Sequence, residues 1–374
     1  MKRIGIAALL LCVCLLPSAW SQPLTCKLPT SWSEFHTKNM HRSNPCERVL
    51  NVRNVGKLSL KWSYATGDNV VSSPTVANGV VYVGSLDHSV YALNAKTGAK
   101  LWSYTTGNWV NSSPAVSNGV VYIGSYDYNV YALNGKTGAK LWSYTTDSYV
   151  FSSPAVSNGV VYVGSWDGNV YALNARTGAK LWSYATGNVV YSSPAVANGV
   201  VYVGSYGGTV YALNGKTGAK LWSYTTGSVV VSSPAVSNGV VYIGSLDVYA
   251  LNAKTGAKLW SYFTGNFVYS SPAVSNGVVC VGSDNYNVFA LNAKTGAKLW
   301  SYTTDSYVFS SPAVANGVVY VGSEGHNVYA LNAKTGAMLW SYSTGNYVDS
   351  SPAVVNGVVY FGSDDYNVYA FGLK

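Results

Sequence analysis

The sequence has few cysteines, and their positions limit their use. Five are present, and Cys12 and Cys14 lie in the leading apolar segment, so that Cys26, Cys46 and Cys280 remain. Three cysteines exclude a disulfide scaffold. Cys26 and Cys46 could pair in an oxidising compartment or stay reduced, whereas Cys280 lies inside a strand-like run.

Histidine is also scarce, and the motifs of common catalytic centres are missing. There is no Gly-x-Ser-x-Gly elbow, no phosphate-binding loop and no zinc-ligand spacing. His36 and His41 could form a metal pair, but no third ligand lies beside them, and surface or capping roles explain them more simply. We therefore predict no catalytic, cofactor-binding or metal-binding residues.

Long apolar runs are absent. The leading run from Ile4 to Leu16 is too short for a comfortable transmembrane helix. It follows Lys2 and Arg3 and precedes a short stretch that ends at Ser21, which is typical of a cleaved export signal. We expect a periplasmic, cell-surface or extracellular protein with no transmembrane segment.

Tryptophan, by contrast, is regularly spaced. Eight tryptophans recur almost always forty residues apart in near-copies of one segment: Trp62, Trp102, Trp142, Trp182, Trp222, Trp260, Trp300 and Trp340. A period near forty with four short β-patterned runs per unit is typical of a β-propeller, in which each repeat is one blade. We predict an all-β, eight-bladed β-propeller.

Each unit contains four strand-like runs, which we name strands A to D. In the second unit they are residues 112–116, 120–124, 130–133 and 141–144. The dipeptide Asn118-Gly119 is a strong hairpin signal between A and B, and a turn around Lys136-Thr137-Gly138 joins C to D. Helical periodicity is absent throughout.

The two ends of the array are out of phase. The first D strand, residues 58–64, precedes any A strand, and the last unit stops at Lys374 after strand C. We infer that the N-terminal strand completes the C-terminal blade, which leaves no missing strand in the ring.

The segment from Ala92 to Trp102, Ala-Leu-Asn-Ala-Lys-Thr-Gly-Ala-Lys-Leu-Trp, resembles the tryptophan-docking motif of the pyrroloquinoline-quinone-like (quinoprotein-type) β-propeller repeats. It recurs in seven units. The resemblance implies that each tryptophan packs on the motif's alanine and on the glycine peptide of the adjacent blade, here Ala92, Gly98 and their equivalents. Enzymes and non-enzymes share this repeat, so it indicates a fold rather than a reaction.

The residues before the first strand form a separate segment. We divide the chain into a signal peptide at residues 1–21, an irregular N-terminal strap at residues 22–50 and the propeller at residues 51–374. Residues 32–45 also look like the leader that precedes the first strand in exported members of the family. Burial of Trp32 and Phe35 would anchor this strap across the propeller.

The units differ mainly in certain loops. In an up-and-down meander the A–B and C–D turns lie on one face of the ring, the turn face, and the B–C and D–A loops lie on the other, the loop face. The turns are nearly invariant, whereas the loops vary and are rich in aromatics, which either stack on a ligand or pack between blades. The candidate binding face comprises Trp109, Asn111, Tyr126, Tyr128, Tyr149, Phe151, Trp166, Tyr191, Phe267, Tyr269, Tyr307, Phe309 and Tyr347.

Charge follows the same division. Thirteen of the 23 basic residues lie in C–D turns, and twelve of the 14 acidic residues lie in loop-face loops. The acidic face could meet cationic partners or bind calcium weakly. Evenly spaced turn lysines are a solubilising feature, so we predict no nucleic-acid partner. Asp87, Asp127 and Asp167 occupy positions that favour Asx-type turn hydrogen bonds.

These features favour an exported, non-catalytic monomer that acts as a protein-binding or assembly platform through its loop face. Its closest functional analogue by resemblance is the propeller lipoprotein of the outer-membrane β-barrel assembly machinery. A carbohydrate-binding surface module and a small quinoprotein oxidoreductase are the alternatives. The units lack the long insertions that build the quinone site in the family's enzymes, so the sequence supports no cofactor, and pyrroloquinoline quinone (PQQ) and calcium stay open only as alternatives.

Overall fold

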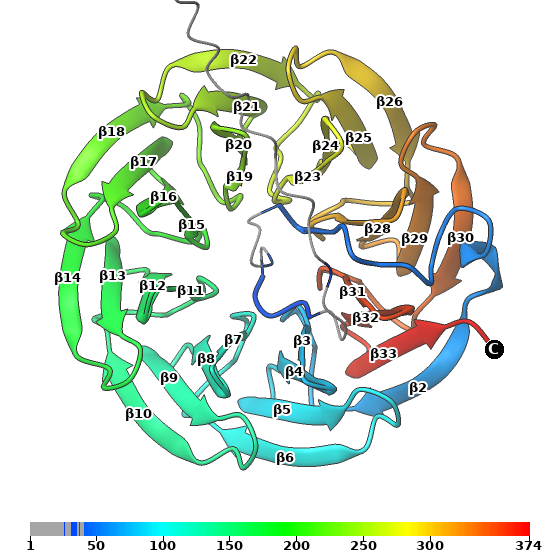
Figure 1. The fold of residues 1–374 in the computed structure, drawn as a ribbon, viewed down its shortest axis with the longest axis horizontal. Coiled ribbons are helices and arrows are strands. Elements are labelled where there is room, and N and C mark those ends of the chain that lie inside the picture. Colours follow the sequence, from blue (N-terminus) through cyan, green and yellow to red (C-terminus); the bar gives the residue numbers. More distant parts are fainter. Residues whose placement is uncertain (1–25, 27–30, 36, 38–40) are drawn as a thin grey trace, which may run out of the picture.

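The computed structural model describes residue 26, residues 31–35, residue 37 and residues 41–374, so the predicted signal peptide lies outside the described residues. Eight sheets, each with four antiparallel blade strands, surround a central axis as the blades of a propeller, and one of them has an additional short parallel strand (Figure 1). The predicted all-β, eight-bladed fold is confirmed. Within the described residues the single helix is one 3-10 turn, η1 (Val55–Lys57).

The blades are numbered 1 to 8 by their innermost strand, strand A. The A strands are β3 (Thr75–Ala77), β7 (Ala115–Ser117), β11 (Ala155–Ser157), β15 (Ala195–Ala197), β19 (Ala235–Ser237), β23 (Ala273–Ser275), β27 (Ala313–Ala315) and β31 (Ala353–Val355). The B strands are β4 (Val80–Gly84), β8 (Val120–Gly124), β12 (Val160–Gly164), β16 (Val200–Ser205), β20 (Val240–Gly244), β24 (Val278–Gly282), β28 (Val318–Gly322) and β32 (Val358–Gly362).

Strands C and D follow toward the outer rim. The C strands are β5 (Ser89–Asn94), β9 (Asn129–Asn134), β13 (Asn169–Asn174), β17 (Thr209–Asn214), β21 (Asp247–Asn252), β25 (Asn287–Asn292), β29 (Asn327–Asn332) and β33 (Asn367–Gly372). The D strands are β6 (Lys100–Thr105), β10 (Lys140–Thr145), β14 (Lys180–Ala185), β18 (Lys220–Thr225), β22 (Lys258–Phe263), β26 (Lys298–Thr303), β30 (Met338–Ser343) and, for blade 8, β2 (Ser59–Ala65).

The burial of each strand follows its place in the blade. Strands B and C are packed between neighbouring blades on both faces, and their β-branched and aromatic runs are almost continuously buried. Strand D lies at the outer edge, and in β6 only Trp102 is buried. In seven of the eight D strands one buried indole therefore ties the outer rim to the core.

The indole contacts the adjacent blade. Trp102 donates from Nε1 to the carbonyl oxygen of Gly135 over 2.9 Å, and Tyr82 donates to the same oxygen over 3.0 Å. A Cβ added to Gly138 would lie 2.8 Å from the Trp102 ring, so only glycine allows this close packing. The same glycine contact occurs for Trp62, Trp102, Trp142, Trp182, Trp222, Trp260 and Trp300.

Trp340 departs from this arrangement. Blade 8 takes its C and D strands from opposite ends of the chain, so it has no C–D turn and no glycine to receive the indole. Trp340 instead contacts the ring of Phe371, with centroids 5.1 Å apart, and is only partly buried. The family pattern of eight equivalent docking tryptophans therefore holds for seven.

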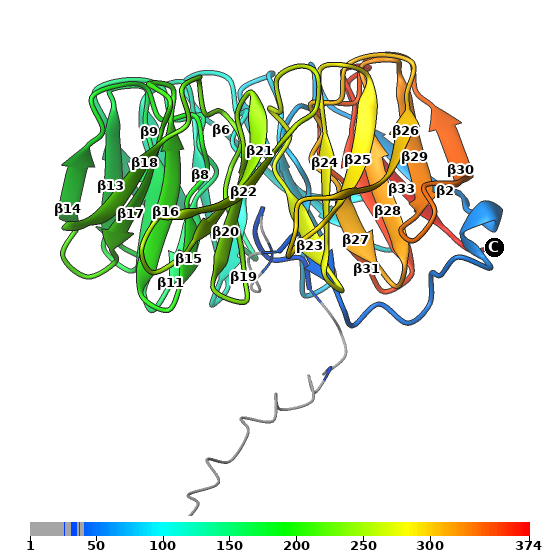
Figure 2. The same ribbon diagram turned by 90° about the horizontal axis from the view of Figure 1, so that it is seen from above.

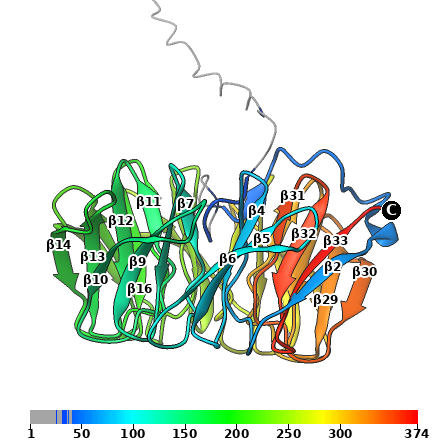
Figure 3. The ribbon, with the colours of Figure 1, turned by 90° about the horizontal axis from the view of Figure 1, so that it is seen from below.

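The N-terminal strand closes the ring. Strand β2 pairs with β33 in antiparallel register, from Ser59 opposite Gly372 to Ala65 opposite Asn367. The two strands lie side by side in Figure 3, blue against red. The predicted completion of the last blade by the first strand is confirmed, and it removes the exposed edge that an open ring would present.

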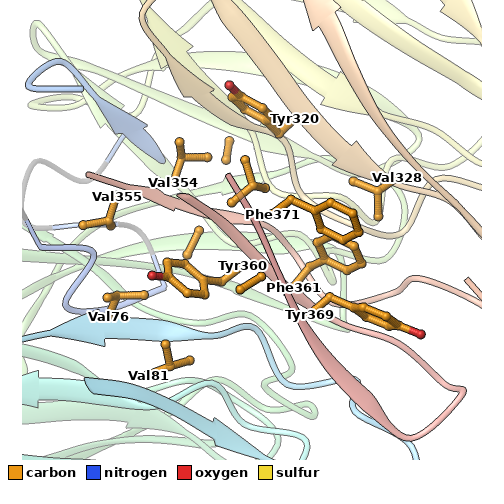
Figure 4. Close-up of a cluster of buried hydrophobic side chains, with 14 of the residues drawn as sticks. Val76, Val81, Tyr320, Val328, Val354, Val355, Tyr360, Phe361, Tyr369 and Phe371 are labelled. Carbon is orange, nitrogen blue, oxygen red and sulfur yellow. The ribbon is translucent and has the colours of Figure 1, made fainter. Parts of the chain in front are cut away.

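A larger apolar cluster fills the seam around blade 8. Figure 4 shows Phe361 and Phe371 stacked in it, with ring centroids 5.7 Å apart. Phe371 stands where other units have leucine, and it also contacts Tyr342 with centroids 4.5 Å apart. Phe371 thus covers part of the Trp340 ring, whereas the equivalent rings of the other blades pack on the glycine of a C–D turn.

The strap runs along the inner edges of the A strands. The backbone amides of Trp32 and of Val76 in blade 1 each donate to the other residue's carbonyl oxygen over 2.8 Å. Strand β1 (Ser43–Asn44) pairs in parallel with β27 of blade 7. The chain then crosses the turn face to the outer rim, as the blue segment in Figure 2 shows. Cys26 and Cys46 form a disulfide, which resolves the alternative that the sequence leaves open.

Arg42 fixes the strap in the channel. Its side chain is fully buried, and it donates to the carbonyl oxygens of Pro312 and Pro352 over 3.1 and 3.3 Å. Its guanidinium lies 4.4 Å from the ring centroid of Phe35, a cation–π contact. Burial lowers the pKa of Arg42 to about 9. Trp32, 1% exposed, is buried as expected, whereas Phe35 remains partly exposed.

Candidate functional site

Backbone hydrogen bonds place the connections on two faces. On the turn face, the amide of Ala95 after strand C donates to Gly79 of the A–B turn over 2.9 Å. On the loop face, the amide of Tyr126 in a B–C loop donates to Trp109 of a D–A loop over 2.9 Å. The variable segments therefore gather at one end of the ring.

A cavity of about 480 Å³ lies on the axis at the loop face, and we name it the axial cavity. Each blade contributes one D–A loop residue, its axial residue: Val71, Asn111, Phe151, Tyr191, Val231, Tyr269, Phe309 and Asp349. Phe35 of the strap also lines it. The strap thus bounds the cavity from within the ring.

The wall of the axial cavity is a hydrogen-bonded circle of serines. The amide of Ser73 donates to Oγ of Ser113 in the next blade over 3.0 Å, and the pattern continues until Ser351 donates to Ser73 over 2.9 Å. The members are Ser73, Ser113, Ser153, Ser193, Ser233, Ser271, Ser311 and Ser351. Because each Oγ accepts an otherwise buried amide, these serines have a structural role.

A second ring of variable residues surrounds the first. The B–C loop residue after the serine that ends strand B is the collar residue of each blade: Leu86, Tyr126, Trp166, Tyr206, Leu246, Asp284, Glu324 and Asp364. Blades 2, 3 and 4 have aromatic collar residues, and blades 6, 7 and 8 have acidic ones. Leucines of the opposite blades 1 and 5 separate the two groups. The collar therefore has an aromatic half and an acidic half, and the axial residues beside the acidic half include Tyr269 and Phe309.

The aromatic half is a continuous chain of ring contacts. Tyr126 and Phe151 have centroids 4.8 Å apart, and Phe151 stacks on Trp166 at 5.7 Å with nearly parallel planes. Trp166 contacts Tyr191 at 4.8 Å, and Tyr191 contacts Tyr206 at 5.7 Å. The rings thus pack between blades and at the same time border the axial cavity.

The acidic half holds carboxyl groups that burial makes hard to ionise. Burial, with the neighbouring Asp364 and Glu324, raises the pKa of Asp349 to about 7. Burial and Glu324 raise the pKa of Asp364 and of Asp284 to about 6. Within the described residues none of these four carboxylates forms an ion pair with a basic side chain.

Several buried polar atoms at this face lack partners. They are Oδ1 of Asn111, Nε1 of Trp166 and one carboxylate oxygen each of Asp284, Asp349 and Asp364. Among the described residues the only other such atom is the hydroxyl of Tyr320. Buried polar groups are normally hydrogen-bonded, so this concentration distinguishes the loop face from the turn face.

The predicted binding residues divide by position. Asn111, Phe151, Tyr191, Tyr269 and Phe309 line the axial cavity, and Tyr126 and Trp166 belong to the collar. The remaining six lie outside both rings: Trp109, Tyr128, Tyr149, Phe267, Tyr307 and Tyr347. The sequence prediction omitted Asp349 and the acidic collar as individual residues.

The loop aspartates shape the turns. Asp87 accepts the amides of Ser89 and Gly67 over 2.9 and 2.7 Å and the hydroxyl of Tyr91 over 2.6 Å. Asp127 and Asp167 make the same contacts to their own loops. The predicted turn role of these three aspartates is confirmed.

The axial cavity does not match an anionic cofactor. PQQ carries three carboxylates, but none of the described lining residues is lysine, arginine or histidine, and Asp349 adds negative charge. The guanidinium of Arg42 is already engaged by backbone carbonyls. His36 lies outside the described residues, and in the described part no three His, Cys, Asp or Glu side chains are grouped to hold a metal.

Comparison with known sequences identifies the repeat. The profile of the family described as outer membrane protein assembly factor BamB matches residues 56–109, 105–193, 167–266, 226–312 and 244–374, which together include every blade. The chain belongs to the BamB family. The resemblance to PQQ-like repeats is thereby confirmed. No curated protein sequence matches the chain.

Solved structures share the BamB-type propeller. BamB from Moraxella catarrhalis superposes with a TM-score of 0.74 and 21% identity over 84% of this chain and 99% of that chain. Quinohemoprotein alcohol dehydrogenase from Comamonas testosteroni superposes with a TM-score of 0.81 and 17% identity over 92% of this chain and 80% of that chain. A europium-containing methanol dehydrogenase superposes with a TM-score of 0.78 and 16% identity over 93% of this chain and 99% of that chain. Identities this low show a common fold alone.

The described part of this BamB-family chain has no helix long and apolar enough to cross a membrane.

Proposed function

We propose that this BamB-family protein is an exported, non-catalytic propeller that binds a partner protein through its loop face. The observation that supports this most is the coincidence of three properties on that face: variation between repeats, exposed aromatics and buried polar atoms without partners. The turn face, by contrast, repeats one lysine-rich turn. Interfaces use such aromatic anchors together with polar groups that gain hydrogen-bond partners on binding.

The lining of the axial cavity favours this proposal over a quinone-dependent oxidoreductase. An anionic quinone would need basic side chains, and the lining supplies serines, aromatics and Asp349. Turnover of alcohols or aldoses with added PQQ and calcium, in a dye-reduction assay, would overturn the non-catalytic proposal.

The test of the platform role is a pull-down from the native cell envelope with tagged mature protein. We compare the wild type with the double variant Trp109→Ala/Trp166→Ala on the loop face and the control Lys136→Ala/Lys216→Ala on the turn face. A partner retained by the wild type and the control, and lost by the loop-face variant, is expected. Equal enrichment by all three proteins would contradict a loop-face interface.

One observation favours carbohydrate binding as the second candidate: Trp109 is 44% exposed at the edge of the aromatic half. Exposed indoles stack on sugar rings as well as on protein side chains. Retention of wild type on a glycan array, lost in Trp109→Ala/Trp166→Ala while the thermal unfolding temperature is kept, would support this candidate.

A further inference from the structure

The loop-face mouth carries a charge imbalance that the chain itself does not neutralise. Asp284, Glu324, Asp349 and Asp364 lie on three consecutive blades, and Asp364 is only 8% exposed. Thirteen basic residues lie in the C–D turns, at the opposite face. Asp349 lines the axial cavity and the other three carboxylates belong to its collar, and no lysine, arginine or histidine is among the described lining residues, although the whole chain has a net charge of +9.

The unpartnered atoms show which kind of ligand is complementary. Four of the five are acceptors, on Asn111, Asp284, Asp349 and Asp364, and one is a donor, Nε1 of Trp166. A sugar hydroxyl donates and accepts alike, and a carboxylate only accepts. An arginine side chain offers five N–H donors and no acceptor. The site needs a ligand rich in donors.

The aromatic half supplies the second element. Phe151 and Trp166 are stacked with planes 8° apart, and they lie in blade 3, across the ring from the acidic blades 6 to 8. A planar guanidinium packs on aromatic faces and forms paired hydrogen bonds with a carboxylate. The axial cavity, at about 480 Å³, has room for such a side chain with its neighbouring backbone.

We propose that the axial cavity and its collar bind a basic peptide segment of the partner by inserting one arginine side chain between the acidic and aromatic halves. This inference rests on the proposed function and specifies the chemistry of the partner. Asp349 and Asp364 accept hydrogen bonds from the guanidinium group. The aromatic rings of the aromatic half pack along the plane of that guanidinium.

The test uses a defined probe, the capped peptide Ac-Gly-Gly-Arg-Gly-Gly-amide, against the same peptide with citrulline in place of arginine. Citrulline keeps the shape and removes the charge. Isothermal titration should give at least about tenfold tighter binding of the arginine peptide at pH 8, as expected for a charge-assisted pair of hydrogen bonds. Equal binding of the two peptides would overturn the proposal.

Protein variants locate the site. Asp349→Asn/Asp364→Asn preserves side-chain size and should weaken binding of the arginine peptide by about tenfold or more. The control Asp147→Asn removes one carboxylate from an exposed D–A loop position outside the cavity and should change the affinity by less than about twofold. Thermal unfolding verifies that each variant is folded. Unchanged affinity in the double variant would overturn the site.

The outcomes separate this inference from the proposed function. Loop-face-dependent capture of a partner without arginine-selective peptide binding would overturn the inference and leave the platform role standing. Arginine-selective binding without any loop-face-dependent partner would support the inference and contradict the platform role.

Discussion

Trp62 donates from its indole Nε1 to the carbonyl oxygen of Ala95 over 3.0 Å, which joins the N-terminal strand of blade 8 to blade 1. Tyr360, from the C-terminal hairpin of blade 8, donates to the same oxygen over 3.1 Å. Trp62 also covers Gly98, where an added Cβ would lie 2.7 Å from the ring. Both ends of the chain thus meet one carbonyl of the first blade.

Replacing Trp62 by alanine should lower the free energy of unfolding by about 3–5 kcal/mol, because it removes a buried indole and leaves a cavity. Trp182→Ala at an interface between internal blades is the matched control and should cost a similar amount. Urea denaturation measures both. A much smaller loss for Trp62→Ala would show that the ring is not sealed at its ends.

Cys280→Tyr should stabilise the protein by about 1–2 kcal/mol. The equivalent tyrosine of blade 5, Tyr242, donates a hydrogen bond from its hydroxyl to the carbonyl oxygen of Ala293 over 3.1 Å. In blade 6, where Cys280 replaces the tyrosine, the corresponding carbonyl oxygen of Ala333 accepts a side-chain hydrogen bond only from Trp300. A cavity of about 440 Å³ borders Cys280 and can receive the ring. Thermal unfolding measures the gain.

The control for that substitution is Cys280→Phe, which supplies the ring without the hydroxyl. The difference between the two variants should be about 1 kcal/mol, the contribution of one buried hydrogen bond. Destabilisation by both would indicate that blades 6 and 7 do not leave room for the ring.

Asp349→Asn should stabilise the protein at pH 8 and have little effect at pH 3.5. The raised pKa of Asp349, about 7, means that the folded protein keeps a proton that the unfolded chain loses near its ordinary value of 3.8. Stability due to this group is therefore complete below about pH 4 and is lost as the pH rises through about 7. Since Asp349 is partly exposed, we expect a gain of roughly 1–3 kcal/mol.

Denaturation curves of wild type and Asp349→Asn at several pH values measure this effect. The groups that face Asp349 are Asp364 and Glu324, so their titration contributes to the same profile. A difference that is independent of pH would contradict a raised pKa.

Arg42→Leu should reduce the free energy of unfolding by about 2–4 kcal/mol, because buried carbonyls of Ser311, Pro312 and Pro352 lose their donor. The control Arg48→Leu changes an exposed arginine of the same segment and should have little effect. Chemical denaturation compares them. Equal stability of both variants would show that the strap is not held through Arg42.

The blades and their closure are readable in the sequence, because both depend on repetition. The forty-residue period fixes each strand, and the missing D strand after residue 372 matches the extra one at residues 58–64. Repetition also predicts, wrongly, that Trp340 docks like the other seven tryptophans. Its environment depends on the C–D turn that blade 8 lacks, and not on its own unit.

The course of the strap is not readable. The strap has no repeat to fix its register, and the backbones of Trp32, His41 and Arg42 form hydrogen bonds with three different blades. Arginine is rarely fully buried, so no pattern predicts that Arg42 enters the channel. Only the folded ring creates the carbonyls that surround it.

The acidic half could have been found from the sequence. Aligning the units on the serine that ends strand B places Asp284, Glu324 and Asp364 at the position of Tyr126 and Trp166. The number of acidic residues in the loop-face loops, taken alone, indicates only a polar face. Their separation from the aromatics emerges when the eight positions are read in cyclic order.

Pairing of β2 with β33 also imposes an order on how the molecule matures. Strand β2, the first blade strand to be synthesised, finds its partner only when the last residues exist, more than 300 positions later. Contacts this distant in sequence slow folding. A growing chain or a truncated product that lacks β33 therefore remains an open ring, in which β2 has no partner strand.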